Sequence, residues 1–283
     1  CNANEIIRIG NGAFLGCTWI EDSIPNVSKS TYIGDSAFWG CSNLKKITLT
    51  GQDTCFVGIN AFSNCPNLLE FELNCRILNG NVSDHSNKQI IITIGENVSE
   101  FNTLLFNNCS IDTLFFLSHT CYSMNSDIVF ANSNLLHLVL GEAVQRLPNH
   151  CFSQFDNLVS FNQLPDSLYY IGSYCFTNSN AIVGELLTPP LVDTISSNAF
   201  LNCDKLLSVT TTAKYIGDNA FSSCDSLHSA ETNAYIIGAG AFSNCGSLSN
   251  VTFGDSVHTI GSNAFANCDN LLSASTNAKD IGD

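Results

Sequence analysis

Basic residues are scarce in this chain of 283 residues, where lysine and arginine number 10 against 25 aspartates and glutamates. The resulting net charge of −15 at pH 7 repels phosphate backbones and anionic membrane surfaces, so nucleic-acid binding is not expected. Long hydrophobic runs are absent as well. The longest all-aliphatic stretch is Ile90-Ile91-Ile92, whereas a membrane helix needs roughly 18 apolar residues. We therefore expect no membrane insertion within this chain.

Metal and catalytic signatures are missing too. The chain contains 14 cysteines but no Cys-x-x-Cys pair, and its 6 histidines do not recur in step with a cysteine, which argues against a zinc site. Gly238-Ala239-Gly240 resembles part of a dinucleotide-binding loop but lacks the surrounding strand and helix pattern. No cluster of titratable residues stands outside the repeat. The sequence therefore predicts no catalytic residue, no cofactor, no metal and no enzyme activity.

What the chain does contain is the motif IGxxAFxxCxxL, clearest at residues 33–44, 216–227 and 260–271. Self-similarity at a period of about 20 to 50 residues marks a stacked repeat protein. The motif phenylalanine sets the register, with intervals of 21 to 24 residues and one interval of 44. Small variation around a constant motif indicates coils that share a core face and differ in loop length. These phenylalanines are Phe14, Phe38, Phe62, Phe106, Phe130, Phe152, Phe176, Phe200, Phe221, Phe242 and Phe265.

One repeat domain is expected over residues 1–283, with about eleven or twelve coils. The long interval predicts an irregular or inserted coil at about residues 76–100. Within it, Asn79 to Gln89 is polar and rich in turn formers. Two interpretations of this segment remain, a degenerate coil and a loop that bulges from the stack, and the loop is favoured. The first and last residues, Cys1 and Asp283, fall inside recognisable repeat segments, so both termini are expected to cut through repeats.

Each motif is followed by a short alternation of apolar and polar residues, as at residues 46–49, 70–73 and 250–253. Such alternation predicts a strand with one buried face. Stacked coils would then form one parallel sheet whose outer face is the possible ligand-facing surface. The residues predicted to line this surface are Lys46, Thr48, Glu70, Glu72, Asn250 and Thr252.

The Ile-Gly step and the AFxxC segment should form the opposite wall. Glycine there permits a positive φ or a close backbone approach. Alanine and phenylalanine, followed by cysteine three residues later, fit a single helical turn with both side chains on one face. The predicted structural ladder is the phenylalanine column Phe38, Phe62, Phe200, Phe221, Phe242 and Phe265 with the cysteine column Cys41, Cys65, Cys203, Cys224, Cys245 and Cys268.

The column cysteines are expected to be buried thiols, because free cysteine behaves as a small hydrophobic residue. Cys55 and Cys121 lie outside the columns and are the candidates for reactive or bridging thiols. Asparagine precedes several column cysteines, as at Asn202 and Asn267. Asparagine tolerates left-handed backbone and can hydrogen-bond the turn backbone of the adjacent coil. A structural ladder is the favoured interpretation, and a solvent-facing turn residue is the alternative.

The extended motif IGxxAFxxCxxLxxIxL resembles the BspA-like leucine-rich repeats, a family of surface proteins in host-associated bacteria and parasitic protists. The resemblance runs from about Ile9 to Asp283, and residues 102–144 diverge most. It implies an α/β repeat solenoid, which is a right-handed leucine-rich-repeat superhelix with one parallel sheet and short helical turns and loops opposite. It also implies exposure on the cell surface or secretion, and binding to a protein ligand such as host extracellular matrix or another cell.

Function must be argued from sites rather than from fold. The first hypothesis is a non-catalytic cell-surface protein that mediates adhesion or protein binding through its exposed sheet face. An intracellular, cytoplasmic interaction scaffold is one alternative, because plentiful unpaired thiols fit a reducing compartment. A structural spacer in a larger surface protein is the other.

Overall fold

The computed structural model describes residues 6–23, 32–51, 53–80, 89–101, 106, 109–121, 123–124, 134–155, 157–161, 163–179, 182–272 and 274–282. The chain divides into two compact units, unit 1 (residues 1–141) and unit 2 (residues 142–283), and each is described by itself. A single solenoid over residues 1–283 stays a prediction. The irregular coil at about residues 76–100 stays one too, because residues 81–88 lie outside the described part.

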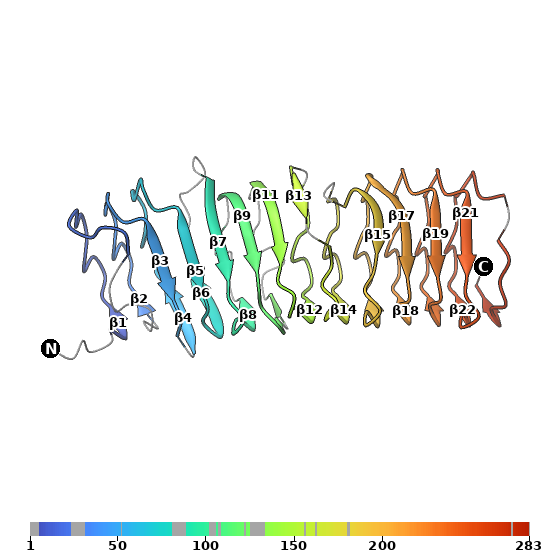
Figure 1. Cartoon of the computed structure of the whole chain (residues 1–283), viewed down its shortest axis with the longest axis horizontal. Coiled ribbons are helices and arrows are strands. Elements are labelled where there is room, and N and C mark those ends of the chain that lie inside the picture. The colour runs from blue at the N-terminus through green and yellow to red at the C-terminus, as the bar shows by residue number, and fades with distance from the viewer. Residues whose placement is uncertain are drawn as a thin grey trace. The chain divides into compact units, whose positions relative to one another are not determined.

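Unit 1 is wound into coils with strands on two walls (Figure 1). A narrow sheet has the order β1, β2, β4, β6, β8, β10, and a broad sheet contains β3, β5, β7, β9 and β11. Within each sheet, neighbouring strands pair in parallel. The narrow-sheet strands are β1 (Arg8–Ile9), β2 (Tyr32–Ile33), β4 (Thr54–Val57), β6 (Ile77–Gly80), β8 (Glu100–Phe101) and β10 (Ser123–Met124). The broad-sheet strands are β3 (Lys46–Leu49), β5 (Glu70–Leu73), β7 (Gln89–Ile94), β9 (Ser110–Phe116) and β11 (Asn134–Leu140).

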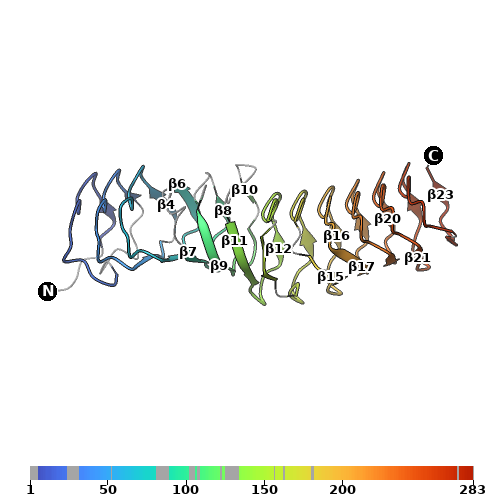
Figure 2. The ribbon, with the colours of Figure 1, turned by 90° about the horizontal axis from the view of Figure 1, so that it is seen from above.

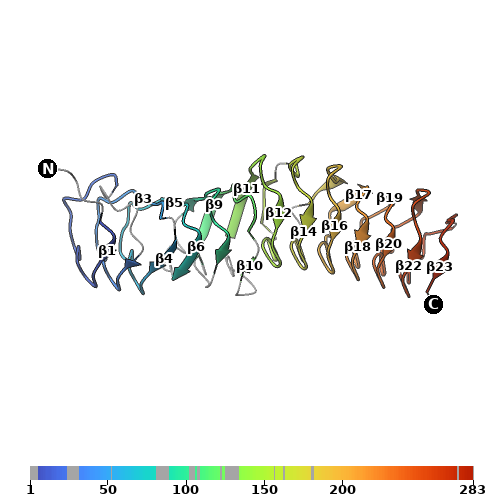
Figure 3. The same cartoon turned by 90° about the horizontal axis from the view of Figure 1, so that it is seen from below.

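Unit 2 repeats this plan, and Figure 3 shows its narrow-sheet strands side by side. They are β12 (Arg146–Leu147), β14 (Tyr170–Ile171), β16 (Thr194–Ile195), β18 (Tyr215–Ile216), β20 (Ile236–Ile237), β22 (Thr259–Ile260) and β23 (Asp280–Ile281). The broad sheet is β15 (Gly184–Leu187), β17 (Leu206–Thr211), β19 (Ser229–Thr232) and β21 (Asn250–Phe253). Strand β13 (Ser160–Phe161) precedes β15 in the chain and does not pair with it.

The broad-sheet strands alternate between core and solvent as their sequences predict. In β3, Ile47 and Leu49 are buried, while Lys46 and Thr48 face outward and are half-buried. Parallel pairing then sets equivalent residues of neighbouring coils opposite one another, as Ile47 is opposite Phe71. Because each coil matches the next in phase, the apolar side chains form one continuous interior within the unit.

The wall opposite the broad sheet differs from the prediction. It is a second parallel sheet, in which the isoleucine of the Ile-Gly step occupies a short strand, as Ile216 does in β18. Figure 2 shows coils from above with both walls in view. The expectation of one sheet with short helical turns opposite it is therefore wrong, and no helix occurs in the part of the chain that the structure describes.

The AFxxC segments are turns because their amides alternate in direction. The amides of Ser36, Phe38 and Gly40 donate to carbonyls of the next coil at 2.8 to 2.9 Å. The intervening amides of Ala37 and Trp39 donate to carbonyls three residues earlier, at 3.2 and 3.1 Å. A helix keeps all these bonds within itself and needs a run of negative φ angles. Here φ is 52° at Ser36 and 74° at Gly40, so the helix cannot form.

Asparagine is the most frequent residue at the left-handed positions of the described turns. Its side chain is short enough to tolerate a positive φ, and φ lies between 52° and 59° at Asn60, Asn64, Asn198, Asn202, Asn219, Asn244, Asn263 and Asn267. Two side chains also bond along the column: Nδ2 of Asn202 donates to Asn178 Oδ1, and Nδ2 of Asn267 donates to Asn244 Oδ1, both at 2.7 Å. The bonds join side chains rather than a side chain to the backbone of the adjacent turn.

Glycine in the Ile-Gly step is required for close packing between coils. A Cβ atom at Gly217 would lie 2.4 Å from the backbone nitrogen of Ser197 in the preceding coil, and one at Gly261 would lie 2.5 Å from that of Ala239. Neither glycine has a positive φ. Of the two predicted reasons for glycine, close backbone approach is the one that applies.

The motif phenylalanines form a stack of rings. Phe200 and Phe221 lie 5.1 Å apart between ring centroids with planes 1° apart, and Phe221 and Phe242 lie 5.2 Å apart. Phe38, Phe62, Phe200, Phe221 and Phe242 are buried, and Phe265 is half-buried. Each large ring removed from water contributes on the order of 1.5–3 kcal/mol.

The column cysteines bind the backbone of the preceding coil through their thiols. The Sγ atom of Cys224 donates to the carbonyl of Phe200 at 3.2 Å, and that of Cys245 donates to Phe221 at 3.1 Å. Cys41, Cys65, Cys203 and Cys268 make the same bond at 3.0 to 3.2 Å. Burial raises the pKa of the Cys203 thiol to about 12 and that of Cys268 to about 11. These thiols stay neutral, as their donor role requires.

Replacing Phe221 by alanine should destabilise unit 2 by about 3–5 kcal/mol. The ring packs against a ring on each side, and its removal leaves a cavity between them. Thr252→Ala is the matched control, because Thr252 is exposed on β21 and should change stability by less than about 0.5 kcal/mol. Denaturant titration of both variants measures the difference. Equal shifts in the unfolding midpoint would contradict the register described above.

Raising the pH should destabilise the fold through Cys203. Its pKa rises from 9.0 to about 12 on folding, so between these values the unfolded chain releases the thiol proton and the folded chain keeps it. The contribution is fully present below the unfolded pKa and is lost as pH rises toward the folded pKa. We expect the free energy of unfolding to fall more steeply above pH 9.0 in the wild type than in Cys203→Ala, measured by urea denaturation across a pH series. Parallel pH profiles for the two proteins would count against a buried neutral thiol.

Candidate functional site

Four of the six predicted ligand-facing residues lie together on the broad sheet of unit 1. Lys46 is opposite Glu70, and Thr48 is opposite Glu72. The Nζ atom of Lys46 is 2.8 Å from Glu72 Oε2 and 4.0 Å from Glu70 Oε2, while Thr48 Oγ1 donates to the same Glu72 oxygen at 3.4 Å. The hydrogen bond to Glu72 raises the pKa of Lys46. All are partly exposed, so the pairs stabilise the fold little, but they form a defined polar cluster on the outer face.

The same outer face becomes apolar farther along unit 1. Register places Glu70 opposite Ile91 and Ile91 opposite Thr113, while Thr93 is opposite Phe115 and Phe115 opposite Val139. Ile91 is 37% exposed, and Phe115 and Val139 are half-buried. This apolar stretch of surface was not predicted from the sequence. Its signal was the run Ile90-Ile91-Ile92, since three successive apolar residues in a strand must place at least one on each face.

The remaining two predicted residues, Asn250 and Thr252, are exposed on β21 in unit 2. Asn250 pairs in register with Ser229, and Thr252 pairs with Glu231. The rows continue through β17 to β15, and they read Glu185, Ser208, Ser229, Asn250 and Leu187, Thr210, Glu231, Thr252. The outer face of the unit 2 broad sheet therefore carries hydroxyl, amide and carboxylate groups and no basic side chain at these positions.

A groove of about 710 Å³ in unit 2 is lined by residues from β13 and the turn after it, and from β15 and its neighbours. Its walls include Val159, Val183 and Leu187, which are 72%, 66% and 65% exposed. Isolated exposed apolar side chains are normal, whereas a group gathered around one concavity marks a candidate interaction site. The charged residues that line it are Asp166 and Glu185, so the groove is apolar with acidic character.

The groove coincides with an irregularity in the broad sheet. Pairing between β15 and β17 shifts register between Gly184 and Glu185, and Gly184 has φ of 83°. After the shift, Leu186 is buried while Glu185 and Leu187 are exposed. An irregularity of this kind changes where neighbouring side chains point, and pairing with β17 continues beyond it from Glu185 to Leu187. This site was not predicted from the sequence either. The signal for it is Gly184 at the start of the strand.

Within the described residues, no group of three or more His, Cys, Asp or Glu side chains is arranged to hold a metal ion. That part of the chain also holds no helix of the length and apolar character needed to cross a membrane.

The family model of the BspA type leucine rich repeat region matches residues 7–128, 123–234 and 214–282, with 6 copies of the repeat. The chain belongs to this BspA-type family. Its solenoid is similar to the crystal structure of a leucine-rich repeat protein from Bacteroides ovatus, with a TM-score of 0.57, 20% identity, and coverage of 98% of this chain and 78% of that one. This similarity concerns the fold alone.

Two further solved structures are similar at a lower level. A leucine-rich repeat protein from Eubacterium ventriosum has a TM-score of 0.44 and 14% identity over 89% of this chain and 70% of that one. A leucine rich cell surface protein from Faecalibacterium prausnitzii has a TM-score of 0.37 and 18% identity over 94% and 70%. No curated protein sequence matches the chain significantly.

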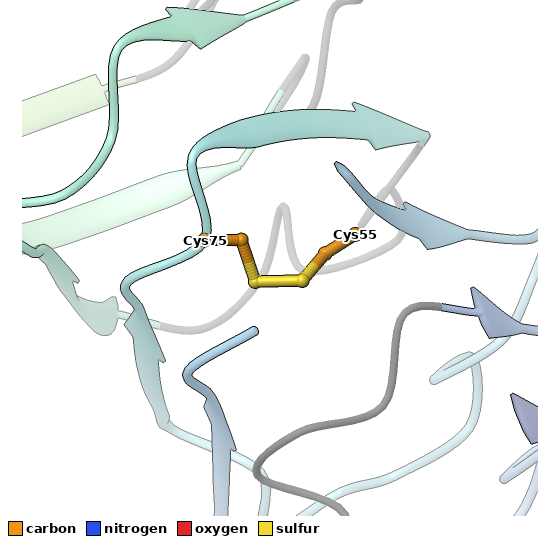
Figure 4. The surroundings of a disulfide bond; sticks show 2 residues. All are labelled: Cys55 and Cys75. Carbon is orange, nitrogen blue, oxygen red and sulfur yellow. A yellow bond between two sulfur atoms is a disulfide. The ribbon is translucent and has the colours of Figure 1, made fainter. Parts of the chain in front are cut away.

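In this BspA-type chain, Cys55 of β4 and Cys75, just before β6, form a disulfide between adjacent coils of unit 1 (Figure 4). Their Cα atoms are 6.0 Å apart. The expectation of a bridging thiol is confirmed for Cys55, whereas Cys121 is a buried thiol and is not accessible to reagents. Cys75 was missed. Its separation of 20 residues from Cys55 is close to one coil, which is the signal that places the two side by side.

Reducing this disulfide should lower the free energy of unfolding by about 3 kcal/mol, the usual value for a loop of this size. Guanidinium denaturation with and without reductant measures the effect. The double variant Cys55→Ala/Cys75→Ala is the control and should be insensitive to reductant. If reductant shifted wild type and double variant equally, the bridge would not account for the change.

Proposed function

We propose that this BspA-type chain is a non-catalytic cell-surface protein that binds a protein ligand through the outer faces of its broad sheets. One observation carries the proposal. Side chains from successive strands stand in register on each of these faces, with their alternate neighbours buried in the core. A rigid row of outward side chains at strand spacing of about 4.8 Å can contact a partner at many points at once.

The chemistry of the two faces favours a protein partner. Unit 1 offers the cluster of Lys46, Thr48, Glu70 and Glu72 beside exposed Ile91. Unit 2 offers hydroxyl and amide groups such as those of Thr252 and Asn250. Mixed polar and apolar surface of this kind is typical of protein interfaces that form between separately folded partners. Adhesion to host matrix or to another cell is the form of binding that the family resemblance implies.

The disulfide between Cys55 and Cys75 supports a location outside the cytoplasm. Disulfides persist in oxidising compartments and are rare where glutathione keeps thiols reduced. The column thiols do not require a reducing compartment, because they are buried and hydrogen-bonded to the Phe carbonyls. A surface location is therefore favoured over an intracellular scaffold.

Binding of the purified chain to extracellular-matrix proteins and to intact host cells tests this proposal. Thr252→Arg places a long side chain on the outer face of the unit 2 broad sheet without touching the core. It should weaken binding by about tenfold or more. Tyr215→Arg is the matched control, because Tyr215 is 43% exposed on the narrow sheet, and it should bind as the wild type does.

Saturable binding that Thr252→Arg weakens and Tyr215→Arg preserves would support recognition by the broad sheet of unit 2. A parallel pair of variants in unit 1, Thr93→Arg on the broad sheet and Tyr32→Arg on the narrow one, assigns the binding to its unit. Equal binding by all four variants would exclude the outer faces. Absence of any bound partner would favour a spacer role.

A further inference from the structure

We propose that the groove beside β15 binds an extended peptide segment of a partner protein, which adds a strand to the open edge of the unit 2 broad sheet and directs a basic side chain at Asp166 and Glu185. This site adjoins the outer face proposed above and shares Glu185 and Leu187 with it. Its occupant pairs with the backbone edge of β15 rather than contacting Asn250 and Thr252, so either proposal can fail without the other.

The open edge is the first observation. Strand β15 pairs with β17 on one side, and no strand of the described part pairs with its other side. The amides of Gly184 and Thr188 donate toward β17, to Lys205 and Thr210 at 3.0 and 3.1 Å. Successive residues of a strand direct their peptide groups to opposite sides, so those of Glu185 and Leu187 point to the open edge.

An edge of this kind is a template for pairing. Unpaired N–H and C=O groups in a row accept another strand, and proteins usually cover or charge such edges to prevent it. Here the edge carries apolar Leu187 and is preceded by Val183, both mostly exposed. Peptides that add to a sheet edge gain affinity from main-chain bonds and specificity from pockets for alternate side chains. The groove supplies both kinds of contact.

The adjoining cavity is the second observation. Its volume of about 710 Å³ lies within the range of about 300–1,000 Å³ typical of ligand sites. Apolar side chains line it from both segments, with Val159 and Leu164 on one and Val183 and Leu187 on the other. An occupant that alternates apolar residues with polar ones would bury the former in this lining.

The charge of the groove is the third observation, and it indicates which side chains the occupant carries. Among its described lining residues the groove has the carboxylates of Asp166 and Glu185 and no lysine, arginine or histidine. Neither carboxylate has a cationic partner within the described residues. A net charge of −15 adds to the local field and attracts cations. A peptide with a lysine or arginine beside its apolar residues is therefore the complementary partner.

The test uses a short capped peptide in which valine alternates with lysine and threonine, added to the whole chain. Fluorescence anisotropy of the labelled peptide should show saturable binding. A peptide of the same sequence with N-methylated amides on the edge-facing residues should bind roughly tenfold or more weakly, because it cannot donate those bonds. Glutamate in place of lysine should also weaken binding. Equal binding of the N-methylated peptide would overturn strand addition.

Protein variants locate the site. Leu187→Ser and Glu185→Gln alter exposed groove residues and should weaken peptide binding several-fold, whereas Leu207→Ser changes a side chain that is 43% exposed outside the groove and should not. Hydrogen exchange should show new amide protection at residues 182–188 on binding. Unchanged affinity in Leu187→Ser, or protection elsewhere only, would overturn the proposal. A dimer of the chain that protects the same amides and excludes the peptide would also overturn it.

Discussion

Alternate amides of the AFxxC turns donate to carbonyls of the next coil, and much of the fold depends on these bonds. Phe38 donates to Ala61, while the carbonyl of Phe38 receives the thiol of Cys65. Two successive turns are thus joined by bonds that neither turn can make alone. Because a buried backbone group without a partner costs free energy, a coil is stable only between neighbours, and stability adds along the stack.

This constraint explains which residue types the motif uses. This bonding needs a left-handed backbone at two positions per turn, which asparagine and glycine supply, as at Asn219 and Gly240. It also needs a small apolar side chain that still carries a weak donor beside the phenylalanine carbonyl, which cysteine supplies. Serine would donate more strongly but lose the apolar contact. The glycine after isoleucine admits the backbone of the preceding coil, as Gly217 does.

The sequence predicted the structural features that repeat from coil to coil. It did not predict the features that depend on backbone geometry or on where a strand stops pairing. The alternation of Ile47 and Leu49 and the burial of the Phe221 ring follow from spacing alone. The helical turn was a wrong prediction because residues three apart share a face in a helix and in this turn alike. The asparagines at Asn198 and Asn202, with positive φ, were the signal that separated the two. For the candidate site, the polar cluster around Lys46 follows the predicted outer face. The open edge at β15 could not be predicted in this way, because it depends on where one strand stops pairing.

Departures from the repeat are where a solenoid can gain individual sites. A coil that matches its neighbours presents only another row of the same surface, whereas β15 ends its sheet and leaves the peptide groups of Glu185 and Leu187 facing an open edge. Leu186 of the same strand is buried, so the coil keeps its core contact while its outer edge differs. The core thus tolerates the irregularity at little cost, and the surface acquires a groove whose shape and charge the regular coils do not have.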